Sequence, residues 1–315
     1  MLLKLVPEKT NVKFVNYRML AFAMSLALVI ASIALFFTHG LSYGIDFKGG
    51  VLMEIKTEQK ADLAAIRQSV GDLGMGTPVV QEFGADTDVL IRLEYQDNKS
   101  LEDIVKEVKQ SLDQNIDGEV SFRRTETVGP KVSGELVEDG ILSVSLAVLA
   151  VLVYIWFRFE WQFGLGAVIA LVHDVLLTIG LFSFIEMEFN LSIIAAILTI
   201  VGYSLNDTVV VYDRVRENLR KYRKMEMLDL LNLSLNETLS RTIMTSVTTL
   251  LALAALFYFG GENIHGFTAA MIWGVFVGTY SSVFIACPVL LWFEMRREPD
   301  SEIPEGMEVL PPEKG

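Results

Sequence analysis

Six long apolar runs dominate the pattern of hydrophobic and polar positions along the chain. A helix needs roughly 20 residues, at about 1.5 Å of rise each, to cross the apolar part of a bilayer. Five of the runs follow one another with almost no polar face, whereas the helices of a soluble protein usually keep one. The pattern predicts an α-helical membrane protein with six transmembrane helices, of which the second and fifth extend into flanking polar residues. The predicted spans are Met19–Phe37, Ile141–Phe157, Phe163–Ile185, Phe189–Tyr212, Ile243–Phe259 and Phe267–Phe293.

The segment between the first two spans, residues 39–138, alternates strand and helix patterns. Strands are predicted at residues 49–56, 77–83, 88–95 and 119–128. Helices are predicted at residues 57–73 and from Ser100, where Ser100-x-x-Asp103 forms a capping box ahead of an apolar stripe. The order β-α-β-β-α-β predicts a ferredoxin-like domain. That fold hosts many functions and identifies no chemistry by itself.

The positions of lysine and arginine predict how the spans are oriented, because short cytosolic loops carry an excess of both. They cluster before the first span and after the second, fourth and sixth, while the loops 186–190 and 260–266 contain none. We therefore expect both termini in the cytosol. The first run lacks a small-residue cleavage site at its end, so we expect an uncleaved anchor. The expected parts are a cytosolic N-terminus (1–18), the first transmembrane helix (19–38), an outer ferredoxin-like domain (39–138), transmembrane helices two to six (139–293) and a disordered cytosolic tail (294–315).

Composition excludes several classes of function. The 315 residues are 52% hydrophobic and carry a net charge of −13, which argues against a nucleic-acid partner. The single cysteine, Cys287, allows no intrachain disulfide, and the three histidines are far apart, so no zinc site is indicated. No nucleophile–base set or metal-ligand spacing is present. We therefore do not expect an enzyme.

Ionisable residues inside the predicted spans are the strongest candidates for function. An Asp, Lys or Arg at a helix centre costs about 2.5–3.5 kcal/mol on insertion scales, and such residues mark ion or proton paths. Asp207 lies in the fourth span about two turns before Arg214, with Asn206 beside it and Tyr203 one turn away on the same face. We interpret this polar patch as part of an ion path. The alternative is a helix-end aspartate solvated from the cytosol.

Two other ionisable sites lie in neighbouring spans. Arg241 precedes the fifth apolar run at a comparable depth and is a candidate counter-charge for Asp207, since opposite charges within about 4–6 Å favour both ionised forms. It is equally compatible with an arginine that snorkels to the interface. His173 and Asp174 fall near the middle of the third span, which favours a functional role. A mutual structural pairing of the two is the alternative.

Two glycine patterns indicate close approaches of the backbone. The stretch "YGIDFKGG" has the Gly44-x4-Gly49 spacing of a phosphate-binding loop, but the Lys and Ser or Thr that this loop requires do not follow Gly49. No nucleotide site is indicated. We interpret Gly44, Gly49 and Gly50 as a tight path from the membrane to the first strand. Gly274-x-x-x-Gly278 in the sixth span predicts close helix packing.

Several motifs taken together resemble the SecF family, membrane subunits of the bacterial Sec protein-export machinery. The resemblance extends from the first span to the last and includes six spans with an outer domain between the first two. Its signature positions here include Asp46 among the glycines of "YGIDFKGG", and Gly202 and Tyr203 of the fourth span. The motifs are "YGIDFKGG", "VGPKV", "FRFEW", "HDV", "VGYSLNDTVVVYDRVREN" and "SRTIMTS".

The resemblance implies membership of the RND superfamily and a place in the bacterial inner membrane, with residues 39–138 in the periplasm. It implies pairing with SecD, association with SecYEG and YajC, and use of the proton motive force to pull translocating preproteins outward. The family's ion path contains the Asp of a Leu-Asn-Asp motif and an arginine on the next span, which correspond to Asp207 and Arg241. We expect the transported ion to be H⁺ or Na⁺, and we expect no cofactor. The alternatives are a small-molecule exporter half of the same superfamily, or an assembly factor that does not transport.

Overall fold

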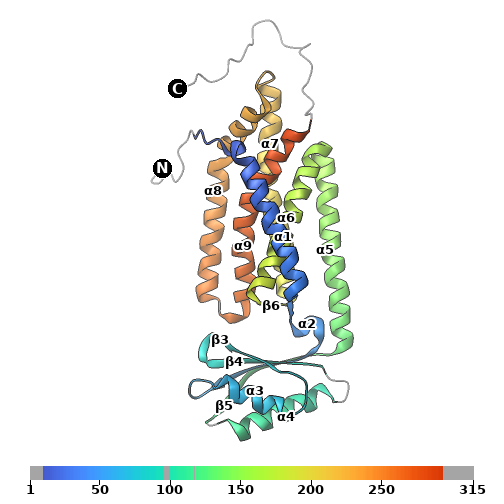
Figure 1. The fold of residues 1–315 in the computed structure, drawn as a ribbon, viewed down its shortest axis with the longest axis vertical. Coiled ribbons are helices and arrows are strands. Elements are labelled where there is room, and N and C mark those ends of the chain that lie inside the picture. The colour runs from blue at the N-terminus through green and yellow to red at the C-terminus, as the bar shows by residue number, and fades with distance from the viewer. Residues whose placement is uncertain (1–9, 96–98, 117, 294–315) are drawn as a thin grey trace.

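A computed structural model gives the fold of residues 10–95, 99–116 and 118–293. The described chain forms a bundle of long helices with a small domain at one end (Figure 1). The described chain begins and ends at the opposite end of the bundle. The predicted tail, residues 294–315, lies outside the described residues, as does the first half of the predicted N-terminus.

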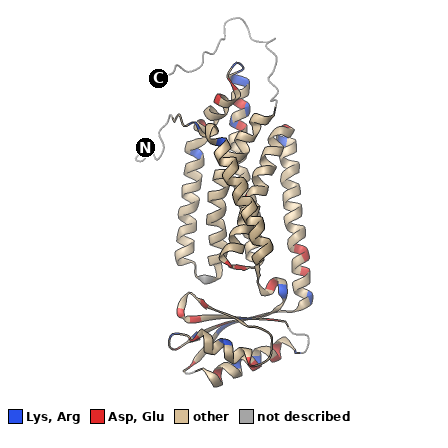
Figure 2. Cartoon of the chain, in the orientation of Figure 1, with Lys and Arg blue, Asp and Glu red and all other residues tan. Residues whose placement is uncertain are grey.

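Within the described residues, six helices are long and apolar enough to cross a membrane, which confirms the predicted fold class. Charged residues gather in the small domain and at the far end of the bundle, and the ribbon between these regions is largely uncharged (Figure 2). The second and fifth spans extend into polar sequence as predicted. The first span, Phe14–His39, comprises the short turn η1 (Phe14–Tyr17) and α1 (Arg18–His39). The next four are α5 (Pro130–Arg158), α6 (Trp161–Ile185), α7 (Leu191–Lys221) and α8 (Met227–Phe259), and the short turn η2 (Glu262–Ile264) precedes the sixth. The sixth span, His265–Trp292, comprises α9 (His265–Ser281), the π-helical η3 (Ser282–Ala286), α10 (Cys287–Val289) and η4 (Leu290–Trp292).

The small domain lies between the first two spans and has the predicted β-α-β-β-α-β order. Its elements are β2 (Gly50–Thr57), α3 (Leu63–Gly71), β3 (Val79–Phe83), β4 (Ala85–Glu94), α4 (Leu101–Asn115) and β5 (Val120–Val128). The sheet order is β3-β4-β2-β5, with all neighbouring strands antiparallel, and both helices cover one face (Figure 1). The predicted cap of α4 is confirmed, because Ser100 Oγ accepts the Asp103 amide at 3.1 Å. A core of buried aliphatic side chains such as Ile66, Ile91 and Ile104 joins sheet and helices.

The helix α3 is shorter than predicted. The sequence pattern predicts a helix over residues 57–73, but Thr57 still belongs to β2 and the helix begins at Leu63. Asp62 sets this start, because its side chain accepts the backbone amides of the second and third residues after it, at 2.9 and 3.0 Å. A capping carboxylate satisfies amides that have no partner inside the helix.

The helix α7 is central to the bundle and packs against α5, α6, α8 and α9. Its contact with α9 depends on the predicted glycine pair. A Cβ atom at Gly274 would lie 2.2 Å from Ile200 Cγ1, and one at Gly278 would lie 3.0 Å from Ser204 Cβ. The close helix packing predicted from this spacing is therefore confirmed.

A short parallel ladder joins the small domain to the bundle. It pairs β1 (Ser42–Tyr43), which follows α1, with β6 (Glu188–Phe189), which precedes α7. The one-turn helix α2 (Ile45–Lys48) then leads into β2. Glycine is required at the start of β2, since Gly50 has a φ of 137° and a Cβ there would lie 2.0 Å from the Leu93 carbonyl oxygen. The sequence pattern did not predict the β1–β6 ladder.

Candidate functional site

Asp207 lies on α7 with only 8% of its surface exposed. Thr242 of α8 donates a hydrogen bond from Oγ1 to Asp207 Oδ1 at 2.6 Å. The second oxygen, Oδ2, is buried and has no hydrogen-bond partner among the described residues. A buried carboxylate is costly unless it is paired, hydrogen-bonded or neutralised. The carboxylate is thus available to take a proton or a cation.

A second buried carboxylate, Asp174 of α6, is hydrogen-bonded on both oxygens and is 1% exposed. Its Oδ2 accepts from Ser204 Oγ of α7 at 2.6 Å and from Ser281 Oγ of α9 at 2.8 Å. Its Oδ1 lies 3.0 Å from His173 Nδ1. The Nε2 atom of His173 is buried without a hydrogen-bond partner in the described part of the chain. Asp174 therefore ties three helices together at one point.

Hydroxyl groups connect the surroundings of the two carboxylates. Ser204 is one turn from Asp207 and Thr208 on α7, and Thr208 Oγ1 lies 3.1 Å from Ser282 Oγ. Ser282 comes directly after Ser281, which donates a hydrogen bond to Asp174, and it begins the π-helical turn η3. Such turns interrupt the regular helical ladder and are frequent at functional sites. Two carboxylates and their hydroxyl neighbours thus form one polar cluster inside the bundle.

Two of the predicted site residues lie on the outside of the described bundle. Asn206 and Arg241 are exposed, and the described residues contain no ion pair within 4.0 Å between Arg241 and Asp207. Thr242, the residue after Arg241, makes the contact with the carboxylate instead. Gly202 is exposed one turn before Asn206. Tyr203 is half-buried, and its hydroxyl has no hydrogen-bond partner among the described residues.

The sequence pattern did not single out four hydroxyl residues of this polar cluster. Ser204, Ser281, Ser282 and Thr208 are all nearly fully buried. Serine and threonine are common in membrane helices, so their presence alone carries little signal. The spacing of Ser204 and Thr208, one turn apart on the face of α7 that also carries Asp207, was a usable signal.

The chemistry of this cluster suits proton or monovalent-cation transfer. Carboxylate and hydroxyl oxygens are hard ligands, and hydroxyls both donate and accept hydrogen bonds. The described residues contain no group of three or more His, Cys, Asp and Glu side chains that could hold a metal ion. Buried ionisable residues in spans mark ion paths more often than structural positions.

Fold and cluster together define a class: a multi-pass helical membrane protein with a ferredoxin-like domain between its first two spans and carboxylates buried in its bundle. Two family profiles match, "SecD/SecF GG Motif" over residues 34–61 and "Protein export membrane protein SecD/SecF, C-terminal" over residues 107–296. The chain is 45% identical over 295 residues to a protein translocase subunit SecF of Rickettsia felis, covering 94% of this chain and 96% of that one. A SecF of Rhodobacter capsulatus is 46% identical, covering 96% and 95%.

Solved structures agree with these matches. The crystal structure of SecDF, a translocon-associated membrane protein from Thermus thermophilus, has a TM-score of 0.81 and 33% identity to the chain. The match covers 92% of this chain and 39% of that one, so the chain spans well under half of the SecDF polypeptide. SecDF in a super-membrane-facing form has a TM-score of 0.67. The chain belongs to the SecF family of protein translocase subunits.

Proposed function

We propose that this SecF subunit couples an ion gradient to the late stage of polypeptide export. In this proposal an ion or proton binds Asp207, changes its charge and shifts α7 relative to its neighbours. The shift moves the small domain against a preprotein that emerges from SecYEG. The proposal is carried by one observation, a buried carboxylate on the central helix with one oxygen that has no hydrogen-bond partner among the described residues.

The energy available is adequate for such a step. Moving one elementary charge through 100 mV yields about 2.3 kcal/mol. Two-state equilibria with a gap of a few kcal/mol respond to a bias of this size. In the proposal Arg241 supplies the positive charge on the neighbouring helix, and Asp174 with His173 forms the second station of the same path. The hydroxyls of Ser204 and Ser281 hold that station in place.

The outward face of α7 supports a helical partner. Ala195, Thr199, Gly202 and Asn206 are exposed at helical spacing, and nothing lies within 4 Å of a Cβ atom built at Gly202. Lipid disfavours an exposed polar side chain such as Asn206, while small residues let a second helix approach closely. We assign this face to SecD, the partner that the name SecDF implies. YajC and SecYEG complete the proposed assembly.

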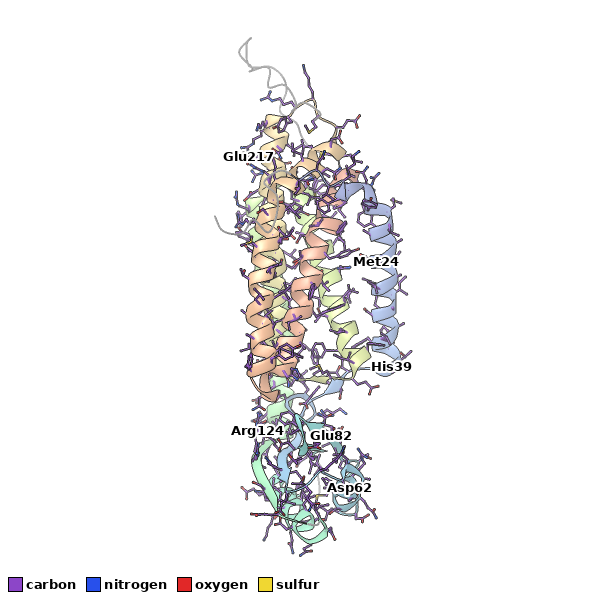
Figure 3. All side chains as sticks on the ribbon, turned by 90° about the vertical axis from the view of Figure 1, so that its left-hand side faces the viewer. Met24, His39, Asp62, Glu82, Arg124 and Glu217 are labelled. Atoms are coloured by element: carbon purple, nitrogen blue, oxygen red, sulfur yellow. The ribbon has the colours of Figure 1, made fainter. Side chains whose placement is uncertain are left out.

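The proposed orientation places both termini in the cytosol and the small domain in the periplasm. It is supported by the basic residues at the end of the bundle away from the small domain (Figure 2), among them Arg158 at the end of α5 and Arg216 and Arg220 near the end of α7. Figure 3 labels Glu217 at this end and His39 at the other. Positive charge in short loops favours the cytosolic side. The proposed membrane is the bacterial inner membrane.

Export of a secreted reporter tests the proposal, in cells whose own SecF is replaced by this chain with its SecD. Asp207→Asn keeps the shape of the side chain but cannot ionise, so we expect export to fall to the level of cells without SecF. Asp213→Asn is the matched control, because this half-buried carboxylate also lies on α7 and pairs with Arg158 at 2.8 Å. Full export with Asp207→Asn would refute the proposed role.

A further inference from the structure

The first turn of α7 is held by a residue of the small domain's connecting motif. Asp46 Oδ2 accepts a hydrogen bond from the backbone amide of Leu191, the first residue of α7, at 3.0 Å. Helix N-termini leave four backbone amides without partners inside the helix and carry a partial positive charge, so a carboxylate is stabilising there. The residue that precedes the helix, Asn190, makes no side-chain cap. Among the described residues, Asp46 supplies the one side-chain hydrogen bond to these amides.

Other contacts align the same two segments. Gly44 donates its amide to the Phe189 carbonyl at 2.9 Å, and the β1–β6 ladder continues from there. A Cβ atom at Gly44 would lie 2.5 Å from Glu188 Oε1, so glycine permits the approach. Arg92 of β4 lies 3.5 Å from Glu188. These contacts bring Asp46 up to the start of α7.

The rest of this junction is loosely filled. A cavity of about 370 Å³ lies between the two parts, lined by Phe83 and Arg124 from the small domain and by Asn190 and Phe267 from the bundle. Figure 3 labels Arg124 at this level of the molecule. Because the junction is not densely packed, a displacement of the bundle reaches the small domain through a few polar contacts and the chain itself.

Asp46 connects the small domain directly to α7, the helix that carries Asp207. The motif continues directly from α2 into β2, an inner strand of the sheet. The chain connections through α1 and α5 join the small domain to helices whose surfaces are largely exposed in the described bundle. By contrast, the hydrogen bond from Leu191 to Asp46 joins the small domain to the central helix of the bundle.

We propose that Asp46 is a positioning residue that fastens the small domain to the first turn of α7, so that movement of α7 is delivered to the sheet. This inference rests on the proposed function, since it requires that α7 moves when Asp207 changes its charge. It assigns a mechanical role to the one carboxylate of the "YGIDFKGG" motif.

Four variants separate this role from simple helix stability. Asp46→Ala removes the acceptor, while Asp46→Asn retains one, because asparagine caps helices as well as aspartate does. Asp62→Ala is the matched control: it removes an equivalent cap, that of α3, inside the small domain and farther from the bundle (Figure 3). Asp46→Ala/Asn190→Asp places a negative charge, which Asn190 lacks, at the helix's own preceding position, so it restores the charge beside the first-turn amides but not the connection to the small domain.

Two measurements on the complex with SecD complete the design. The first is the hydrogen-exchange rate of the backbone amides in the first turn of α7. The second is export of a reporter with and without an ion gradient. We expect Asp46→Ala to exchange about fivefold faster there and to lose gradient-stimulated export. We expect Asp46→Asn and Asp62→Ala to keep that stimulation. The double variant should recover slow exchange without recovering export.

Recovery of export in the double variant would overturn the inference, because a local cap would then suffice. Full stimulation in Asp46→Ala would overturn it as well, while leaving the role of Asp207 intact. Should Asp46→Ala fail to assemble with SecD, the double variant decides the question on its own. If an ion gradient did not stimulate export by the unmodified complex, the proposed function itself would be refuted.

Discussion

The contact between α7 and α9 predicts that Gly274→Ala has opposite effects on stability in two backgrounds. The substitution should destabilise the chain when Ile200 is present and stabilise it when Ile200 is replaced by alanine. A Cβ atom at Gly274 would lie 2.2, 2.5 and 2.9 Å from three side-chain atoms of Ile200. Ile200 is 1% exposed, so its branched side chain has little space to move. Over-packing of this kind costs about 1–3 kcal/mol, and the better helix propensity of alanine returns about 1 kcal/mol. Gly274→Ala should therefore lower the free energy of unfolding by up to about 2 kcal/mol.

The same substitution should be stabilising once the obstacle is removed. Ile200→Ala alone costs about 2–5 kcal/mol through lost burial and the cavity it leaves. Ile200→Ala removes the three atoms that a Cβ at Gly274 would meet most closely. In that background Gly274→Ala partly fills the space, so it should raise the free energy of unfolding by about 1 kcal/mol. The assay is unfolding of the four purified chains in detergent, analysed as a double-mutant cycle. An effect of equal sign in both backgrounds would refute the proposed steric conflict.

Two other predictions concern the exposed face of α7 and the junction. Gly202→Ala should leave the unfolding of the chain alone unchanged or slightly improved, yet weaken co-purification with SecD about tenfold; unchanged co-purification would contradict the assigned interface. Burial raises the pKa of the Glu188 carboxyl above its usual range, while Arg92 opposes this shift and Asp46 adds to it. The contribution of Glu188 to the free energy of unfolding is therefore full below the ordinary pKa of a glutamate. That contribution is lost as the pH rises through the raised pKa of the folded chain. Thermal unfolding from pH 4 to 8 should show the unmodified chain losing stability relative to Glu188→Gln; parallel curves would exclude that linkage.

Much of the architecture could be predicted because it depends on local periodicity. The spans follow from the length of the apolar runs, and the small domain follows from alternating strands and amphipathic helices. The glycine pair of α9 predicted a close contact correctly, because two glycines one turn apart leave room for a neighbouring helix. The predicted start of α3 was wrong, since residues 57–62 fit a helical pattern but the cap at Asp62 fixes the start at Leu63.

The site was only partly predictable because it depends on which helix faces meet. The mid-span position of Asp174 could be read from the sequence, but its hydrogen-bond donors Ser204 and Ser281 come from two other helices. Likewise the contact of Asp46 with Leu191 joins residues 145 positions apart, and no local pattern encodes such a pairing. Arg241 remains a prediction: its side chain is exposed in the described chain, and no local sequence pattern fixes which face of α8 it lies on.

In the proposed mechanism an ion acts at Asp207 to drive export. The most direct measurement is reporter export into vesicles that contain the translocon and the complex of this chain with SecD, under a pH gradient or a sodium gradient applied separately. We predict that one of the two gradients stimulates export with the unmodified chain and that neither does so with Asp207→Asn. Equal stimulation of the Asp207→Asn complex would contradict this mechanism.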